Sequence, residues 1–166
     1  MNKTILFLFT SLGFCLNAQK KKMAYKDASL SIEERVEDLL PRMSLEEKVA
    51  QMRIFHANIG VKSDENGNME LSDRVIEKLK LGIAGIKNPG EHISPLAAAK
   101  LNNELQKYIM DSNRWGIPAL FVTESYNGVD AAGCTKFGRP ITSAASFNPV
   151  LVKKIWDVVG REARLR

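Results

Sequence analysis

The sequence predicts an α/β fold in which helices cover a parallel sheet, preceded by short capped helices. Apolar runs at 83–86 and 119–122 have the length of strands and the composition of strands that are buried on both faces. A helical pattern at 94–109 separates them, as in a strand, helix, strand unit of a parallel sheet. The helices begin at serine or asparagine residues that can cap them.

Residues 1–18 resemble a secretory signal peptide. A lysine lies near the start, an apolar segment runs from Ile5 to Leu16, and Ala18 is a small residue at the expected cleavage point. The apolar segment has about twelve residues, whereas a membrane-spanning helix needs roughly twenty. Phe14 is too bulky for lipoprotein processing at Cys15. We expect a periplasmic or secreted protein that has no membrane attachment after cleavage.

Charge and composition exclude several functions. Cleavage after Ala18 would remove one lysine and no acidic residue, so the net charge would fall from +5 to +4. The lysines at 20–22 are predicted to lie in a solvated leader, and no aromatic residues alternate with basic ones, so no nucleic-acid partner is expected.

Cysteine and histidine usage argues against disulfide, metal and cofactor chemistry. Cys134 is the single cysteine after residue 18, so no internal disulfide is expected, and we interpret it as an unreactive loop residue. His56 and His92 lack the spacing of metal ligands, so no metal or cofactor is predicted.

Two capped helices open the mature chain. Ser31 with Glu34 three residues later forms a capping box, and Pro41 ends the helix that follows. Ser44 and Glu47 repeat this pattern and begin a second helix. Apolar residues recur at helical spacing in both, at Ile32, Val36, Leu39 and Leu40 and then at Leu45, Val49 and Met52.

The next region contains a turn, a helix and a strand. Residues 53–60 are compatible with either a strand or a loop, and residues 64–68, DENGN, are typical of a turn. Ser72 is expected to cap a helix that Gly82 ends. Residues 83–86 then form a short strand.

A long helix and a second strand follow. Ser94 and Pro95 begin the helix, and residues 119–122 form the strand. Glu124 lies two residues after this strand. Because α/β folds place their chemistry at the carboxyl ends of parallel strands, Glu124 is the first candidate functional residue.

The last part of the sequence predicts a loop and a helix. Residues 125–147 are rich in small and polar residues and are predicted to form a long functional loop. Asn148 and Pro149 begin a helix whose amphipathic pattern continues to Arg166. A closed barrel of strands and helices takes about 250 residues. We therefore expect further strands beyond Arg166, or an isolated chain with exposed apolar surface and marginal stability.

Three segments carry a resemblance to a known family. They are ASLSIEERVEDLLPRMSLEEKVAQM at 28–52, WGIPALFVTESYNGV at 115–129 and ITSAASFNPVLVKKIWDVVGREARLR at 141–166. In this order they resemble the N-terminal third of family 3 glycoside hydrolases, especially exported bacterial beta-glucosidases and related beta-xylosidases. The resemblance implies the incomplete N-terminal part of a (β/α)8 TIM-type barrel over residues 31–166, after a signal peptide at 1–18 and an extended leader at 19–30.

The resemblance also implies a sugar-binding site. Glu124 matches an acid, often aspartate in the family, that holds hydroxyls of the sugar in the cleaved position. Asn127 stands where the family usually has histidine, and its amide can still donate and accept hydrogen bonds. Arg139, in the same loop, is a further candidate contact for a substrate hydroxyl.

The catalytic groups themselves are not expected in this sequence. Retaining glycosidases need two carboxyl groups about 5 Å apart, and the resemblance places both the nucleophile and the acid/base beyond Arg166. We expect a hydrolase that removes terminal beta-D-glucosyl residues from a beta-linked oligosaccharide or glucoside, and an isolated 166-residue chain without activity. A beta-xylosidase of the same family and a non-catalytic secreted sugar-binding or interaction module remain alternatives.

Overall fold

The computed structural model describes residues 23–166, which divide into two compact units between Arg42 and Met43. The predicted signal peptide at 1–18 lies outside the described residues. Within residues 23–166, no helix combines the length and the apolar character that a membrane crossing requires.

The described part of the first unit consists of η1 (Ala24–Lys26), α1 (Ile32–Leu39) and η2 (Leu40–Arg42). The predicted capping box is confirmed, because the Ser31 side chain accepts from the Glu34 N–H and the Glu34 carboxylate accepts from the Ser31 N–H.

The extended leader predicted up to residue 30 is wrong for residues 24–26. Tyr25 is buried in a 3₁₀ turn, its N–H donates to the Asp38 carboxylate over 3.1 Å, and its carbonyl accepts from Arg35 Nε over 2.8 Å. These side chains of α1 hold the backbone of the turn, which a reading of local sequence does not reveal.

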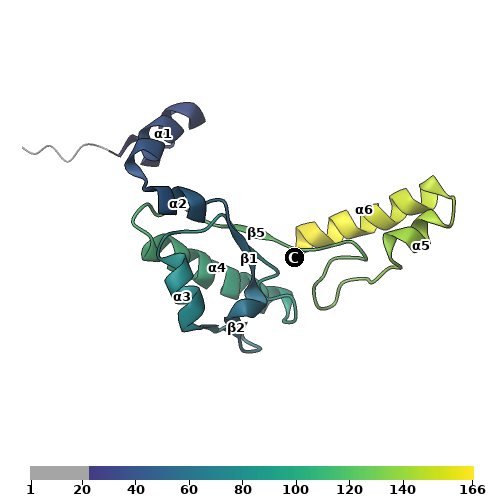
Figure 1. The fold of residues 1–166 in the computed structure, drawn as a ribbon. Helices are drawn as coiled ribbons and strands as arrows, with labels where there is room; N and C mark the ends of the chain where they lie inside the picture. The colour runs from purple at the N-terminus through teal and green to yellow at the C-terminus, as the bar shows by residue number, and fades with distance from the viewer. Residues whose placement is uncertain (1–22) are drawn as a thin grey trace, which may run out of the picture. The chain divides into compact units, whose positions relative to one another are not determined.

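The second unit contains a three-stranded parallel sheet, whose outer strands β1 and β5 are labelled in Figure 1. Its order is β1 (Ile54–His56), β4 (Gly85–Lys87) and β5 (Leu120–Val122). The ambiguous segment 53–60 thus contains a strand, followed by η3 (Ala57–Ile59). The predicted turn at 64–68 joins an antiparallel pair that the sequence did not predict, β2 (Val61–Ser63) and β3 (Met69–Leu71).

The helices of the second unit are α2 (Leu45–Ala50), α3 (Asp73–Leu79), α4 (Pro95–Ser112), α5 (Pro140–Ala144) and α6 (Pro149–Leu165). Four begin where the sequence predicted. Helix α5 is a correction, because it lies inside the predicted loop 125–147 and begins with Pro140 in its first turn. Ser72 precedes α3 with N-cap dihedral angles, but its side chain makes no capping hydrogen bond.

Helices α3 and α4 cover one face of the sheet. Strand residue Ile86 is fully buried against a core that both helices supply. The main helical contributions are Val75, Leu79, Leu101, Leu105 and Ile109, each at most 1% exposed. Gln106 of α4 also fixes the approach to β5, because its side-chain amide donates to and accepts from the backbone of Ala119 over 2.8 and 2.9 Å.

The other face of the sheet is open among the described residues. Leu120 is 69% exposed, Ile54 is 53% exposed and Val122 is 38% exposed. The prediction that residues 119–122 are buried on both faces is therefore wrong for this structure. The reason is that α3 and α4 both pack on the same side, and residues 23–166 provide no layer on the opposite side.

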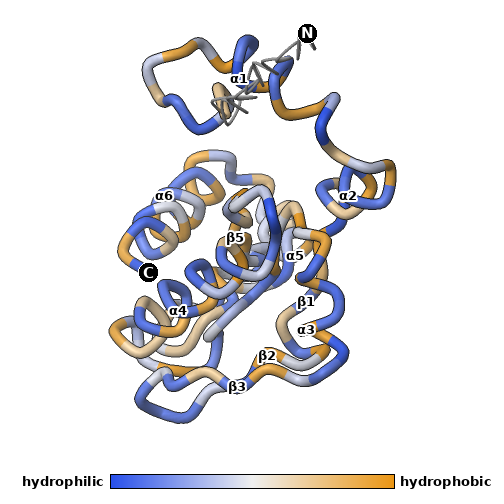
Figure 2. The backbone as a smooth tube through the Cα atoms, turned by 90° about the vertical axis from the view of Figure 1, so that its left-hand side faces the viewer, coloured by the Kyte–Doolittle hydropathy of each residue, from blue (hydrophilic) through white to orange (hydrophobic). Residues whose placement is uncertain are grey.

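Helix α6 is amphipathic, with apolar and polar residues interleaved along it (Figure 2). Val159 is 4% exposed and packs with Val129 and Ala131 of the preceding loop. The carboxylate of Glu162 accepts from both the N–H and the hydroxyl of Thr135, over 3.0 and 2.7 Å. These contacts attach α6 to the loop that follows Glu124.

Candidate functional site

The candidate site lies at the carboxyl ends of β4 and β5. These strands are parallel neighbours, with Lys87 opposite Val122 in register, so the residues that follow them lie at the same edge of the sheet. Asn88 follows β4, and Glu124 lies two residues after β5. The structure brings these two segments into direct contact.

Asn88 connects the ends of both strands. It is 4% exposed and has φ 53°, a left-handed conformation that asparagine tolerates better than most residues. Its N–H donates to the Val122 carbonyl over 2.8 Å, and its side-chain oxygen accepts from the Glu124 N–H over 3.1 Å. Its side-chain amide donates to Asp130 Oδ2 over 3.3 Å. Asn88 therefore fixes the backbone that carries Glu124.

The carboxylate of Glu124 is paired on one side only. Its Oε1 lies 2.6 Å from Lys87 Nζ, and the two side chains are 53% and 30% exposed. No other residue among 23–166 forms a hydrogen bond or ion pair with this carboxylate, so none of them donates to Oε2. The site thus presents a fixed acceptor beside a fixed ammonium group.

The loop after Glu124 folds back onto the strand ends. The Asp130 N–H donates to the Glu124 carbonyl over 2.8 Å, and Lys136 Nζ bridges the Asp130 carboxylate and the Val129 carbonyl over 3.2 and 2.9 Å. Gly128 has φ 102°, and a Cβ there would lie 2.0 Å from the Thr135 carbonyl oxygen. The loop therefore depends on glycine at this position.

Asn127 and Arg139 do not join Glu124 in this structure. The Asn127 carbonyl accepts from the Phe137 N–H over 2.8 Å, and Asn127 borders an apolar hollow of ≈ 140 Å³ beside α5 and α6. Arg139 occupies the N-cap position of α5. Within residues 23–166, neither side chain forms a hydrogen bond or ion pair with Glu124.

Sequence reasoning missed the residues that hold Glu124. Lys87 and Asn88 follow the apolar run 83–86 as Glu124 follows the run 119–122, so a usable signal was present. A second hollow of ≈ 200 Å³ is bordered by Asn88, Thr123 and Asp130, among others. No cluster of three potential metal ligands occurs among the described residues.

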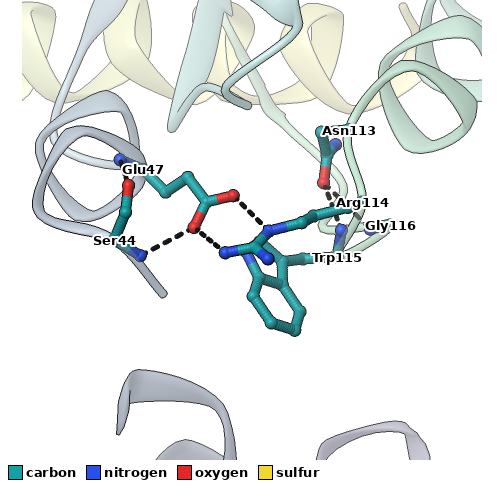
Figure 3. A network of polar contacts seen from close by, with 6 residues as sticks. All are labelled: Ser44, Glu47, Asn113, Arg114, Trp115 and Gly116. Carbon is teal, nitrogen blue, oxygen red and sulfur yellow. Dashed lines mark hydrogen bonds and ion pairs between the residues drawn. The ribbon is translucent and has the colours of Figure 1, made fainter. Parts of the chain in front are cut away.

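A second carboxylate, Glu47, is held much more completely (Figure 3). It is 7% exposed and accepts from Arg114 Nε and Nη2 over 2.6 and 2.9 Å, and from the Ser44 N–H over 2.7 Å. The Arg114 guanidinium also lies 4.3 Å from the centre of the Trp115 ring. The bidentate bond from Arg114 lowers the pKa of Glu47 from 4.5 to about 2.

The Glu47 network joins two distant segments. Glu47 begins α2, whereas Arg114 lies between α4 and β5, where Asn113 Oδ1 accepts from the N–H groups of Trp115 and Gly116 over 3.1 and 2.9 Å. The sequence predicted Glu47 as a capping-box residue, which is confirmed. Its partner 67 positions away carried no local sequence signal.

Comparison with known proteins finds relatives named beta-xylosidase and beta-glucosidase. The chain is 72% identical to a provisionally named beta-xylosidase from Formosa agariphila over 99% of its own length, and 31% identical to a beta-xylosidase/alpha-L-arabinofuranosidase from Medicago sativa over 93%. It superposes on a solved beta-glucosidase from Erythrobacter marinus with a TM-score of 0.62 and 29% identity, covering 86% of this chain. No established family profile matches the chain.

The matches confirm the resemblance to glycoside hydrolases named beta-xylosidase and beta-glucosidase, and an α/β architecture shared with one of them. The chain spans only a small part of these relatives. It covers 22% of the Formosa protein, 13% of the Medicago protein and 18% of the Erythrobacter chain.

Proposed function

We propose that this chain is the N-terminal part of an exported family 3 glycoside hydrolase that removes terminal beta-linked sugars with retention of configuration. The observation that carries the proposal is Glu124, a half-exposed carboxylate at the carboxyl edge of a parallel sheet, held by Asn88 and Lys87. The names of the relatives point to the same substrate class.

Glu124 is suited to holding a sugar. A carboxylate can accept hydrogen bonds from two hydroxyl groups, and such charge-assisted bonds are roughly twice as strong as neutral ones. Oε2 is available to a substrate, while Lys87 and Asn88 limit the movement of the side chain and backbone. Fixing the sugar ring in this way favours attack at its anomeric carbon.

The catalytic carboxylates are proposed to lie outside these 166 residues. A retaining mechanism requires a pair about 5 Å apart that is free to react. Asp130 is occupied by Asn88 and Lys136, and Glu162 is occupied by Thr135, so both carboxylates already have structural partners. The much greater length of the relatives supports this placement.

The open face of the sheet supports a (β/α)8 TIM-type barrel in the parent protein. Ile54 of β1 and Leu120 and Val122 of β5, the two outer strands of the sheet, project away from the covering helices, and all are at least 38% exposed. Further parallel strands that curved the sheet would enclose these side chains in a barrel interior, where branched apolar residues dominate.

The test is hydrolysis of 4-nitrophenyl beta-D-glucoside by the full-length polypeptide that carries this sequence. We expect turnover, with the beta-anomer as the first product in an NMR time course. The isolated 166-residue chain should release no nitrophenol. Sugar binding without turnover by the full-length polypeptide would favour the non-catalytic module, and the alpha-anomer as first product would contradict retention.

A beta-xyloside is the second candidate substrate. It is favoured by the 72% identity to a provisionally named beta-xylosidase, which exceeds the identity to the beta-glucosidase. The ratio of kcat/KM for 4-nitrophenyl beta-D-xyloside and beta-D-glucoside decides between the two sugars. A ratio above about 10 corresponds to at least 1.4 kcal/mol of preferential transition-state binding and would assign the enzyme to xylosides.

Export is proposed from the pattern of residues 1–18, namely a lysine, an apolar segment and a small residue at Ala18. N-terminal sequencing of the mature protein from a native or bacterial host should begin at Gln19. Retention of Met1 in the cell-associated protein would count against export.

A further inference from the structure

Lys87 lies on the open face of the sheet. Side chains alternate along a strand, and Phe55, Ile86 and Phe121 belong to the helix-covered core. The residues that precede and follow them along each strand therefore project to the opposite face. Lys87 is paired with Val122 on one side and with His56 on the other, so this face carries polar side chains at the ends of β1 and β4 and the apolar Val122 at the end of β5.

The ammonium group of Lys87 has capacity beyond its bond to Glu124. An ammonium carries three donors, and the structure shows one ion pair, from Nζ to Glu124 Oε1 over 2.6 Å. The Lys87 side chain is 30% exposed, so its remaining donors are accessible from solvent. Glu124 Oε2, on the carboxylate that Lys87 contacts, offers a neighbouring acceptor.

This arrangement matches neighbouring hydroxyl groups of a sugar. Each hydroxyl both donates and accepts a hydrogen bond. One hydroxyl can donate to Glu124 while its neighbour accepts from Lys87, and the ion pair fixes the separation of the two protein groups. Half-exposed ion pairs contribute little to folding stability, so a gain in stability alone does not account for the ion pair between Lys87 and Glu124.

We propose that Lys87 is a second substrate-binding residue, which donates to a hydroxyl of the sugar that Glu124 holds. The inference rests on the proposed function and adds a residue to it. The ligand it implies is a pyranoside with at least two neighbouring free hydroxyls, bound at the carboxyl ends of β4 and β5.

The test uses the full-length polypeptide with three variants, Lys87→Met, Lys87→Arg and Lys153→Met. Lys153→Met is the matched control, because it removes another ion-paired lysine, 2.8 Å from Asp157, on α6. Each protein is assayed on an aryl beta-glycoside and on the 2-, 3- and 4-deoxy analogues of that glycoside. Thermal unfolding is measured in parallel.

We expect Lys87→Met to lower kcat/KM about 10- to 100-fold on the parent substrate, because a hydrogen bond from a charged donor is lost. On the deoxy analogue that lacks the contacted hydroxyl, the same substitution should cost less than about 3-fold. Lys87→Arg should retain more activity than Lys87→Met, because it keeps the charge and donors. Lys153→Met should match wild type on every substrate.

The outcomes separate the inference from the proposed function. Equal losses for Lys87→Met on the parent and on all three analogues would overturn the role of Lys87 while wild-type turnover upheld the function. If Lys87→Met fails to fold, Lys87→Gln replaces it, because it also removes the ammonium group: equal losses on all four substrates would overturn the role, and a loss that disappears on one deoxy analogue would support it. Absence of wild-type turnover would overturn the proposed function, and the inference with it.

Discussion

Glu47 and Glu124 are both paired with cations, and their surroundings differ sharply. Glu47 is 7% exposed and accepts hydrogen bonds from Arg114 Nε and Nη2 and from the Ser44 backbone (Figure 3). Glu124 has a side chain that is 53% exposed and is bonded by Lys87 at one oxygen only. The first group joins α2 to the segment before β5, whereas the second remains open at the sheet edge.

The difference shows which carboxylate is available for a ligand. A buried carboxylate whose acceptors are all satisfied stabilises the fold and cannot bind substrate without losing those bonds. A carboxylate with a fixed backbone and one free oxygen costs the fold little and offers a preorganised acceptor. We therefore expect substitutions at Glu124 to affect activity and substitutions at Glu47 to affect stability.

The largest effect is expected for Glu124→Ala in the full-length polypeptide. Loss of the charge-assisted hydrogen bond to the sugar, and of the partner that holds Lys87 in place, should lower kcat/KM roughly 100-fold or more on an aryl beta-glycoside. The midpoint of thermal unfolding should stay within about 2 °C of wild type, because the Lys87 pair is half-exposed. A drop in unfolding temperature that accounts for the lost activity would assign Glu124 to the fold instead.

The next largest effect is expected for Glu47→Gln, which should lower the stability of the fold. Substitution removes the charge that Arg114 binds in bidentate geometry, so the free energy of unfolding should fall by about 1–2 kcal/mol, a range that allows for solvent screening at the exposed Arg114. Urea unfolding measures this change. Glu46→Gln, at the exposed neighbouring position, is the control, and it should lower the free energy of unfolding by less than Glu47→Gln does. Comparable losses for both variants would contradict a specific role of the Arg114 pair.

The stabilisation by Glu47 should also depend on pH. Because folding lowers the pKa of this carboxyl from 4.5 to about 2, its contribution is fully present above pH 4.5 and is lost as the pH falls towards 2. The difference in unfolding free energy between wild type and Glu47→Gln should therefore shrink between pH 4.5 and 2. Urea unfolding at pH 7, 4 and 2.5 checks this, and a difference that stayed constant would exclude the Arg114 bond as its source.

The smallest effect is expected for Lys153→Met. This lysine forms an exposed pair with Asp157 one turn along α6, and such pairs add little to stability. The unfolding midpoint should shift by less than about 2 °C, as measured by circular dichroism. A larger shift would show that α6 depends on its surface charges more than on the packing of Val159.

The elements that the sequence predicted correctly have local signals. The capping boxes at Ser31 and Ser44 and the asparagine cap of α6 at Asn148 depend on residues three positions apart. Strands β4 and β5 were found because their apolar residues are contiguous, and Glu124 because it ends such a run.

The features that the sequence did not reveal depend on distant contacts. Arg114 reaches Glu47 from 67 positions away, and the fold around Tyr25 depends on side chains of α1. Helix α5 has only five residues, too few for a periodic pattern. Lys87 became a candidate only when the register placed it beside Glu124.

The most direct test of the central claim is a crystal structure of the full-length polypeptide with a non-hydrolysable thio-linked beta-glycoside. We predict that Glu124 Oε2 lies within about 3 Å of a hydroxyl of the sugar in the cleaved position, with Lys87 Nζ within hydrogen-bonding distance of the neighbouring hydroxyl. A sugar ring bound away from the ends of β4 and β5, with Glu124 still facing solvent, would contradict the assignment of this site.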